Sequence, residues 1–256
     1  MTTVNDIYSF LNEFCPFDTA LGFDNAGLLI GSKNDNVTSA VVALDCTKSA
    51  AEKAINNGAQ LIITHHPVIF SGLKSIPSDS IYALLLKNGI NVICAHTNLD
   101  AAKGGVNDCL CAALGLKDVS PLICSDSFPI RMGFVEAEMT PKQFAVYAGE
   151  LLGFSPRFCE GSGKIRKVAV CGGAGGDYIT DAAANGCDAL LTGEIKHHRY
   201  ILAENLGITA VDCGHFATED TVIEPLAALL KENFPNINFI TDHHSAVKCF
   251  RGYVND

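Results

Sequence analysis

Histidines and carboxylates occur at similar spacings in the two halves of this chain, where they could bind metal ions. The first half contains Thr-His-His-Pro at residues 64–67, followed by His96 and Asp100. The second half contains His215 and Glu219, which repeat the four-residue spacing of His96 and Asp100. Imidazole and carboxylate groups together favour zinc, manganese, iron or cobalt over calcium. These residues therefore predict a site for divalent transition-metal ions.

The adjacent histidines His65 and His66 favour two ions over one. Neighbouring side chains of an extended strand point to opposite sides, and Pro67 biases His66 toward an extended conformation. Two ions, one bound by each histidine, would suit side chains that point to opposite sides. The carboxylates would then balance the positive charge of the ions. In two-metal sites the ions lie about 3.5–4 Å apart, and a bridging water ionises near neutral pH. We therefore expect two divalent metal ions per chain, held by His65, His66, Asp100, His215 and Glu219.

A repeated sequence indicates that the two halves share one fold. The string Asn-Gly-x-x-apolar-apolar-apolar-Thr occurs at residues 57–64 and again at residues 185–192. Apolar strand-like runs alternate with helical segments in both halves, which predicts parallel strands joined by crossover helices. The fold class is therefore α/β, with two pseudo-repeated lobes, mainly parallel sheets and a metal cleft between the lobes. We place the lobes at residues 1–126 and 127–256, with the C-terminal strand able to return to the first lobe.

The predicted elements place the candidate ligands just after strands. Ligands of open α/β sheets bind beyond the carboxyl ends of the strands, which is where these residues fall. Pro225 would disrupt a helix that already runs from His215, so we expect His215 and Glu219 on a loop. The predicted strands cover residues 28–31, 40–44, 61–64, 91–95, 131–136, 168–170, 188–191, 208–211 and 237–240. The predicted helices include residues 9–14, 49–56, 81–87, 200–205, a segment that starts at Thr140, one that ends near Asn185, and one between Thr221 and Asn233.

Composition narrows the class of protein. The net charge of −10 disfavours binding to nucleic acids and to anionic membranes. No apolar stretch approaches the roughly 20 residues that cross a bilayer, and residues 1–10 lack the basic and apolar parts of a signal peptide. Most of the 11 cysteines fall in predicted strands or helices, which indicates thiols in a reducing compartment rather than disulfides. We therefore expect a cytoplasmic protein with a small-molecule substrate, without nucleic-acid or membrane partners.

Four further motifs could have a chemical or a structural role. His197 and His198 could face a substrate or lie on a surface helix. The glycines of residues 172–176 could cradle an anion or form a tight turn, and the basic run 164–167 is expected in a solvated loop. The triplet Asp242-His243-His244 resembles a phosphoesterase motif but lacks the accompanying aspartates, so we do not assign it to the site.

The chain resembles the Nif-three-like family, whose members are also called dinuclear metal-centre proteins or GTP cyclohydrolase I type 2 homologues. The resemblance rests on residues 23–29, 64–67, 96–100, 191–194 and 214–219. It implies two interlinked α/β lobes, a dinuclear site in their cleft on the same five ligands, and a homohexamer. The additional central domain of longer family members is missing from this sequence.

Two functions are compatible with these features. The first is a metal-dependent hydrolase that acts on a small phosphorylated or heterocyclic, nucleotide-like substrate. In this hydrolase His96 or Glu194 would serve as general acid or base. The alternative is a non-catalytic metal-binding scaffold, metal chaperone or interaction protein. An exchangeable coordination position distinguishes them, because a hydrolase needs one and a structural site does not.

Overall fold

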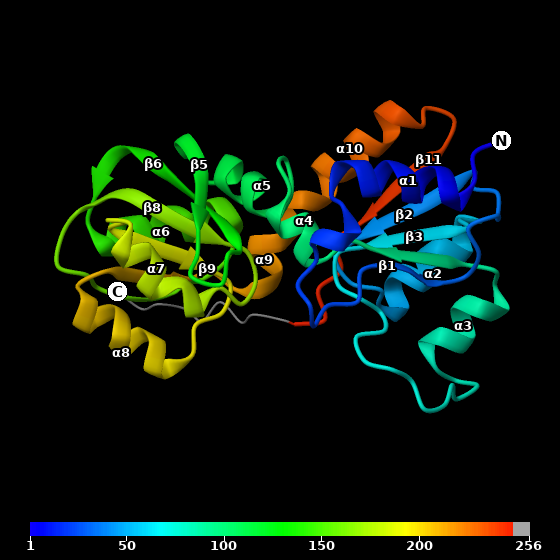
Figure 1. Ribbon diagram of the computed structural model, residues 1–256, viewed down its shortest axis with the longest axis horizontal. Helices are drawn as coiled ribbons and strands as arrows, with labels where there is room; N and C mark the ends of the chain where they lie inside the picture. Colours follow the sequence, from blue (N-terminus) through cyan, green and yellow to red (C-terminus); the bar gives the residue numbers. More distant parts are fainter. Residues whose placement is uncertain (248–256) are drawn as a thin grey trace. The chain divides into compact units, whose positions relative to one another are not determined.

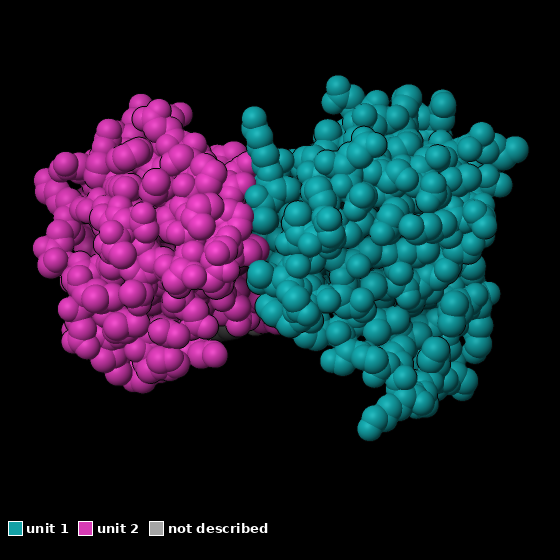
Figure 2. Space-filling view, in the orientation of Figure 1, with its two compact units in different colours: residues 1–105, 222–246 teal, residues 106–221, 247–256 magenta. Residues whose placement is uncertain are grey.

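The chain forms two compact units. The computed structural model describes residues 1–247, and Figure 2 colours the units. The first unit contains residues 1–105 and 222–246, and the second contains residues 106–221. The boundary expected at 126/127 therefore lies inside the second unit, because strand β5 (Lys117–Ile123) pairs with strand β6 (Pro129–Met139) across that position.

The first unit is built on a five-stranded sheet in the order β1-β4-β3-β2-β11. Four strands run parallel: β4 (Asn91–Cys94), β3 (Leu61–Thr64), β2 (Ser39–Ala43) and β11 (Asn238–Asp242). Strand β1 (Gly27–Ile30) pairs antiparallel with β4 at one edge. At the other edge, β11 brings the end of the described chain back beside β2.

Helices cover both faces of this sheet. Helices α2 (Lys48–Asn56) and α3 (Ile81–Lys87) bury small and branched side chains against residues such as Val41 and Ile62. Figure 1 shows α1 (Val4–Phe14) and α10 (Ile223–Asn233) on the opposite side of the sheet. Two short helical segments, α4 (Thr97–Ala101) and the 3₁₀ turn Phe17–Thr19, contact each other.

The second unit contains a six-stranded sheet in the order β5-β6-β8-β9-β10-β7. Strands β8 (Ile165–Cys171), β9 (Ala189–Thr192) and β10 (Thr209–Asp212) form its parallel core. Strands β6 and β7 (Arg157–Cys159) pair antiparallel with the two sides of this core. Most of the basic run 164–167 lies within β8 rather than in the loop expected from its charge.

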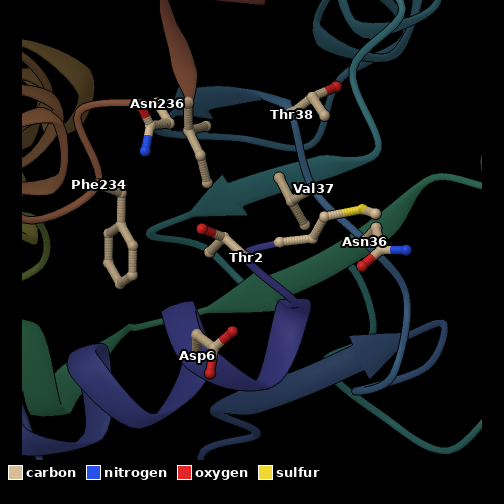
Figure 3. Close-up of a pocket in the computed structure, with 9 residues that line it drawn as sticks. Thr2, Asp6, Asn36, Val37, Thr38, Phe234 and Asn236 are labelled. Carbon is tan, nitrogen blue, oxygen red and sulfur yellow. The ribbon is translucent and has the colours of Figure 1, made fainter.

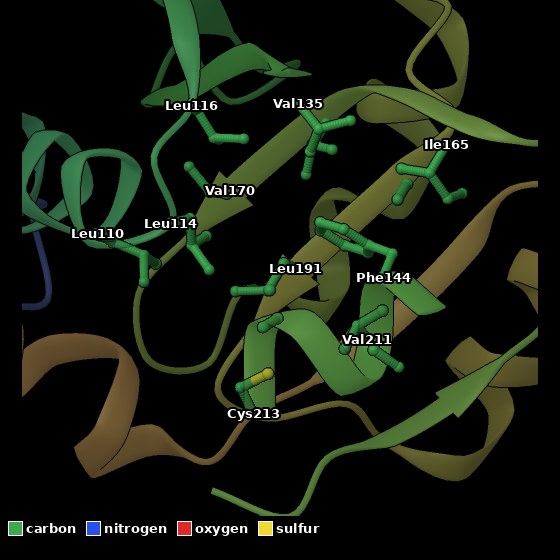
Figure 4. Close-up of a cluster of buried hydrophobic side chains, with 14 of the residues drawn as sticks. Leu110, Leu114, Leu116, Val135, Phe144, Ile165, Val170, Leu191, Val211 and Cys213 are labelled. Atoms are coloured by element: carbon green, nitrogen blue, oxygen red, sulfur yellow. The ribbon is translucent and has the colours of Figure 1, made fainter. Parts of the chain in front are cut away.

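Helices α5 (Val106–Ala113) and α6 (Pro141–Leu152) pack against the sheet in a buried hydrophobic cluster of this unit. Figure 4 shows Phe144 of α6 among side chains of β6, β8, β9 and β10. The remaining helices are α7 (Ile179–Ala184), α8 (His197–Leu206) and α9 (His215–Glu219), with 3₁₀ turns at Gly176–Tyr178 and Asp220–Val222. No helix within residues 1–247 is long and apolar enough to span a lipid bilayer.

The predicted α/β repeat is confirmed and extends further than the sequence string. Each unit has the order helix, edge strand, then three parallel strands that alternate with helices. Helices α1 and α6 both begin with a capping box, from Thr3 and Asp6 in one and from Thr140 and Gln143 in the other. The edge strands β1 and β7 each pair antiparallel with the third core strand of their unit.

The strand registers correct one detail of the repeat. Thr64 pairs with Cys94, and its equivalent Thr192 pairs with Asp212. His96 therefore corresponds to Gly214, and these two residues precede five-residue helices, α4 and α9. The match of His96 with His215, which rested on the spacing to a carboxylate, is wrong by one residue. The two units consequently present different side chains from the same framework.

Candidate metal centre

Three histidines cluster at the carboxyl ends of β3 and β4 in the first unit. His65 and His66 directly follow β3, and His96 follows β4 by one residue. Their ring centroids lie 4.9–5.5 Å apart. One ring nitrogen from each histidine lies within 4.8 Å of the others. This spacing lets the three imidazoles approach a common cation.

The adjacent histidines do not diverge as expected. The backbone continues the parallel ladder beyond β3, with His65 N donating to Ala43 O at 3.3 Å and His66 N to Leu44 O at 2.9 Å. Even so, the two rings have centroids 4.9 Å apart and planes inclined by 47°. The expectation that alternation alone separates the rings is therefore wrong, because rotation about the side-chain bonds brings them to one side. The number of ions is a separate matter and remains a prediction.

Each histidine of this cluster contacts an oxygen through its Nδ1 atom. His65 Nδ1 lies 3.0 Å from Ala95 O, and His66 Nδ1 lies 2.8 Å from Asp45 Oδ1. His96 Nδ1 lies 2.8 Å from Asp24 Oδ1. A carbonyl oxygen or an ionised carboxylate only accepts hydrogen bonds, so Nδ1 carries the proton in each ring. Nε2 then carries the lone pair that a metal ion would bind.

Asp24 is the most strongly held of these partners. It also accepts hydrogen bonds from Thr97 N at 3.1 Å and Thr97 Oγ1 at 2.6 Å. Burial alone would raise the pKa of Asp24, but the hydrogen bonds from His96 and Thr97 hold that pKa well below its usual range. The carboxylate is therefore ionised at neutral pH and fixes the orientation of the His96 ring.

Asp100 adds a carboxylate to the first unit's set. It lies on α4, and its Oδ1 is 3.6 Å from His65 Nε2. Nε2 is the nitrogen that the tautomer argument assigns to a metal ion, so the carboxylate faces the correct side of the ring. The first unit thus brings together four of the predicted site residues: His65, His66, His96 and Asp100.

The second unit brings His215, Glu219 and Glu194 together. His215 and Glu219 lie on one face of α9, with His215 Nε2 3.1 Å from Glu219 Oε2. The loop predicted for them is wrong, because α9 ends at Glu219 and a 3₁₀ turn separates it from α10. Pro225 then falls in the first turn of α10, where a missing amide proton is tolerated.

His215 has the same Nδ1 arrangement as the other histidines. Its Nδ1 lies 2.9 Å from Glu194 Oε1, which leaves the lone pair on Nε2, toward Glu219. The buried Asp212 accepts a hydrogen bond from Gly214 N at 3.0 Å. It also forms an ion pair with Arg157 at 2.5 Å. Asp212 thereby fixes the turn that directs His215.

The glycine-rich segment 172–176 supports α9. Gly173 N donates to Thr218 Oγ1 at 3.1 Å, and Gly173 has a φ of 61°. A side chain at Gly173 would place its Cβ 2.1 Å from Glu219 Oε1. The turn interpretation of this segment therefore fits the structure, because glycine is needed for the close approach of the backbone to Glu219.

Other candidate features lie apart from these groups. His197 and His198 are exposed at the start of α8, in agreement with the surface-helix alternative. In the triplet at residues 242–244, Asp242 forms an ion pair with Lys53 at 2.6 Å, and His243 lies 2.9 Å from Glu224.

A cavity of about 570 Å³ in the first unit contains none of the predicted site residues. It lies beside the start of α1, where Asp6, Val37 and Phe234 are among the residues that line it (Figure 3). Its lining residues include no histidine or cysteine. The candidate chemistry is therefore found in the side-chain clusters at the strand ends and not in this cavity.

Sequence reasoning missed Asp45 and Asp212. Asp45 lies two residues beyond β2, and Asp212 is the last residue of β10. Their position at strand ends is a usable signal, although a solvent-exposed aspartate there looks the same in sequence. Asp24 belongs to the cluster as well, because it accepts a hydrogen bond from His96 Nδ1.

Comparison with known proteins identifies the family. The model for Duf34/NIF3 (NGG1p interacting factor 3) matches residues 2–246. A Clostridium perfringens protein named GTP cyclohydrolase 1 type 2 homolog is 33% identical over 93% of this chain and 95% of its own length. A crystal structure of a hypothetical Staphylococcus aureus protein has a TM-score of 0.90 at 30% identity, over 97% of this chain and 99% of that one. A Bacillus cereus protein related to NIF3 also has a TM-score of 0.90, at 25% identity, over 98% of this chain and 99% of that one. This chain therefore belongs to the Duf34/NIF3 family.

Proposed function

We propose that this protein is a metal-dependent hydrolase with two divalent ions per chain. The substrate is a small phosphorylated or heterocyclic, nucleotide-like molecule. The proposed metal ligands are His65, His66, Asp100, His215 and Glu219. The relatives' shared name, GTP cyclohydrolase 1 type 2 homolog, supports the substrate class.

One observation carries the metal assignment. In the three histidines of the proposed ligand set, Nδ1 faces a carbonyl or carboxylate oxygen at 2.8–3.0 Å. Such partners orient metal-binding imidazoles in proteins and increase their basicity. A set of structural histidines would not need the same nitrogen to be assigned in every ring. The donor set of imidazole nitrogen and carboxylate oxygen fits zinc, manganese, iron or cobalt.

His96 is the best candidate for proton transfer. Its Nδ1 proton is held by the ionised Asp24, so Nε2 is able to accept a proton from a reacting group. The carboxylate of Asp24 then stabilises the imidazolium that forms. Glu194, the other candidate, is engaged with His215 Nδ1 and better suits orientation of that ligand. Bound divalent ions would supply charge stabilisation for the scissile group and lower the pKa of a coordinated water.

Metal content tests this proposal first. Elemental analysis of protein purified without chelators or a metal-binding tag should give about two transition-metal ions per chain. Glu219→Ala should lower this content strongly, because it removes a carboxylate ligand. His197→Ala is the matched control, because His197 is exposed on α8 and lies outside both groups.

Equal metal content in the two variants would overturn the ligand assignment. If the metal is present, hydrolysis of nucleotides should be screened with wild-type protein and His96→Gln. Loss of turnover with full metal content in His96→Gln would support the proton-transfer role. A metal-loaded protein whose ions do not exchange and which hydrolyses none of the substrates would favour the non-catalytic metal-binding alternative.

The assembly and the cellular location are part of the same proposal. We propose a cytoplasmic homo-oligomer, a hexamer by analogy with the family. No disulfide joins the cysteines within residues 1–247, which is compatible with a reducing compartment. Light scattering of the purified protein would test the hexamer directly.

A further inference from the structure

Two exposed phenylalanines lie beside the histidine cluster of the first unit. The side chains of Phe23 and Phe70 are 63% and 53% exposed. Their ring centroids are 6.3 Å apart with planes inclined by 38°, and the Phe70 ring meets His96 edge-on at 6.5 Å. Single exposed apolar residues are common. Phe23 and Phe70 instead form a pair from two separate loops next to His96, which is the arrangement expected of a ligand-binding surface.

The rings are carried on anchored backbone. Phe23 precedes Asp24, whose carboxylate is bound by His96 and Thr97. Phe70 follows Ile69, whose carbonyl oxygen accepts a hydrogen bond from Asn25 Nδ2 at 2.6 Å. This bond joins the two loops that bear the rings. The pair is therefore held in place before any ligand binds, which reduces the entropic cost of binding.

We propose that Phe23 and Phe70 form a stacking site for a planar aromatic heterocycle, such as a nucleobase. A centroid separation of 6.3 Å with planes inclined by 38° is that of two rings in contact, so a planar ligand would stack on their exposed outer faces and not between them. Phenylalanine has no hydrogen-bonding group, and its flat face suits a π-system more than a sugar or a phosphate. A heterocycle on Phe70 would have its edge toward His96.

This inference deepens the proposed function, on which it rests for the identity of the substrate, but its binding test does not need turnover. The chain contains no tryptophan. Phe23→Trp therefore introduces a single fluorescent reporter that preserves an aromatic face at the site. Guanosine and adenosine are the probes, and ribose 5-phosphate is the control that lacks the ring.

Titration of Phe23→Trp with each nucleoside should change its fluorescence to saturation, whereas ribose 5-phosphate should not. Adding Phe70→Ala should raise the Kd at least about fivefold, because stacking on one aromatic ring contributes that much or more. Ile76→Ala is the matched control, since Ile76 is also half exposed and precedes the same helix, α3. It should change the Kd less than about twofold.

The outcomes separate this inference from the hydrolase proposal. Nucleoside binding that persists in excess EDTA supports the stacking site whether or not the protein is a hydrolase. Nucleoside binding by metal-loaded protein that hydrolyses none of the nucleotides supports the stacking site and contradicts the hydrolase. Failure of both nucleosides to bind overturns the stacking site, as does an unchanged Kd in Phe70→Ala. A changed molar mass of Phe70→Ala in light scattering, with no effect on the Kd, overturns it in favour of an interface between copies of the chain.

Discussion

Replacing Gly173 with alanine should disrupt the pair His215 and Glu219 of the second unit without removing either of these proposed metal ligands. The new Cβ would lie 2.1 Å from Glu219 Oε1 and 3.1 Å from His215 Nε2. Carbon and oxygen atoms in contact lie about 3.5 Å apart, so the carboxylate has to move by about 1 Å or more. Distances in metal sites are held to within about 0.2 Å. The shifted carboxylate is therefore expected to bind metal poorly.

Two effects contribute to the outcome of this substitution, and a control separates them. A non-glycine residue in the left-handed region costs about 1–2 kcal/mol of folding free energy. Gly186 has a φ of 67°, close to the 61° of Gly173, but no atom lies within 4 Å of the Cβ position at Gly186. Gly186→Ala therefore has the backbone cost alone, and Gly173→Ala has both that cost and the clash with Glu219.

Metal affinity is the decisive measurement. Apo protein titrated with zinc by calorimetry should show a Kd about 10–100-fold higher for Gly173→Ala than for wild type, the usual effect of disturbing the surroundings of a metal ligand. Gly186→Ala should bind zinc like wild type, with a smaller loss of thermal stability than Gly173→Ala. Equal zinc affinity in the two variants would refute the packing of Gly173 against a metal-binding Glu219.

Three further predictions concern the pKa values and the core. Asp24→Asn should make the free energy of unfolding less dependent on pH in the acid range. A carboxylate with a lowered pKa stabilises the protein above its ordinary titration range, and this contribution is lost as the pH falls. Urea unfolding at several pH values measures this, and a pH dependence equal to that of wild type would contradict the hydrogen bond to His96. Phe144→Ala should lower the unfolding free energy by about 3–5 kcal/mol, whereas Val146→Ala on the exposed side of the same helix should change it by less than about 0.5 kcal/mol; equal losses would show that Phe144 is not the core residue of α6. Burial and the neighbouring carboxylate raise the pKa of Cys46 to about 12. Iodoacetamide at pH 8 should therefore modify Cys46 about a thousandfold more slowly in the native protein than in urea. Mass spectrometry follows the modification, and rapid modification of Cys46 in the native protein would contradict this.

The sequence was sufficient to predict the fold class because its signals were local. Asn-Gly pairs separate helical segments from the apolar strands that follow them. Strand β3 and helix α3 have the bounds expected from these patterns. The capping box at Thr140 and Gln143 forms as its spacing predicts. The C-terminal strand was expected to be able to return to the first lobe, and β11 pairs with β2. The boundary between the units was not accessible in this way, because it depends on β5 pairing with β6.

The candidate site was predicted in its residue types and not in its geometry. The spacing of His215 and Glu219 indicated a shared role, but Pro225 suggested a loop where a five-residue helix forms. A single proline blocks a continuous helix and says nothing of a short one that ends before it. The oxygen partners of Nδ1 depend on strand order, since Asp24 meets His96 only because β1 pairs with β4.

The return of α10 and β11 to the first sheet has a consequence for the order of folding during synthesis. Residues 106–221 of the second unit lie in the sequence between the two parts of the first. At roughly 5–20 residues per second, translation of that segment takes on the order of ten seconds. During this time the β2 edge of the first sheet has no neighbour, since its partner β11 is not yet made. Residues 106–221, with all six strands of the second sheet, are therefore available before the first sheet is, which is completed only when residues 222–246 leave the ribosome.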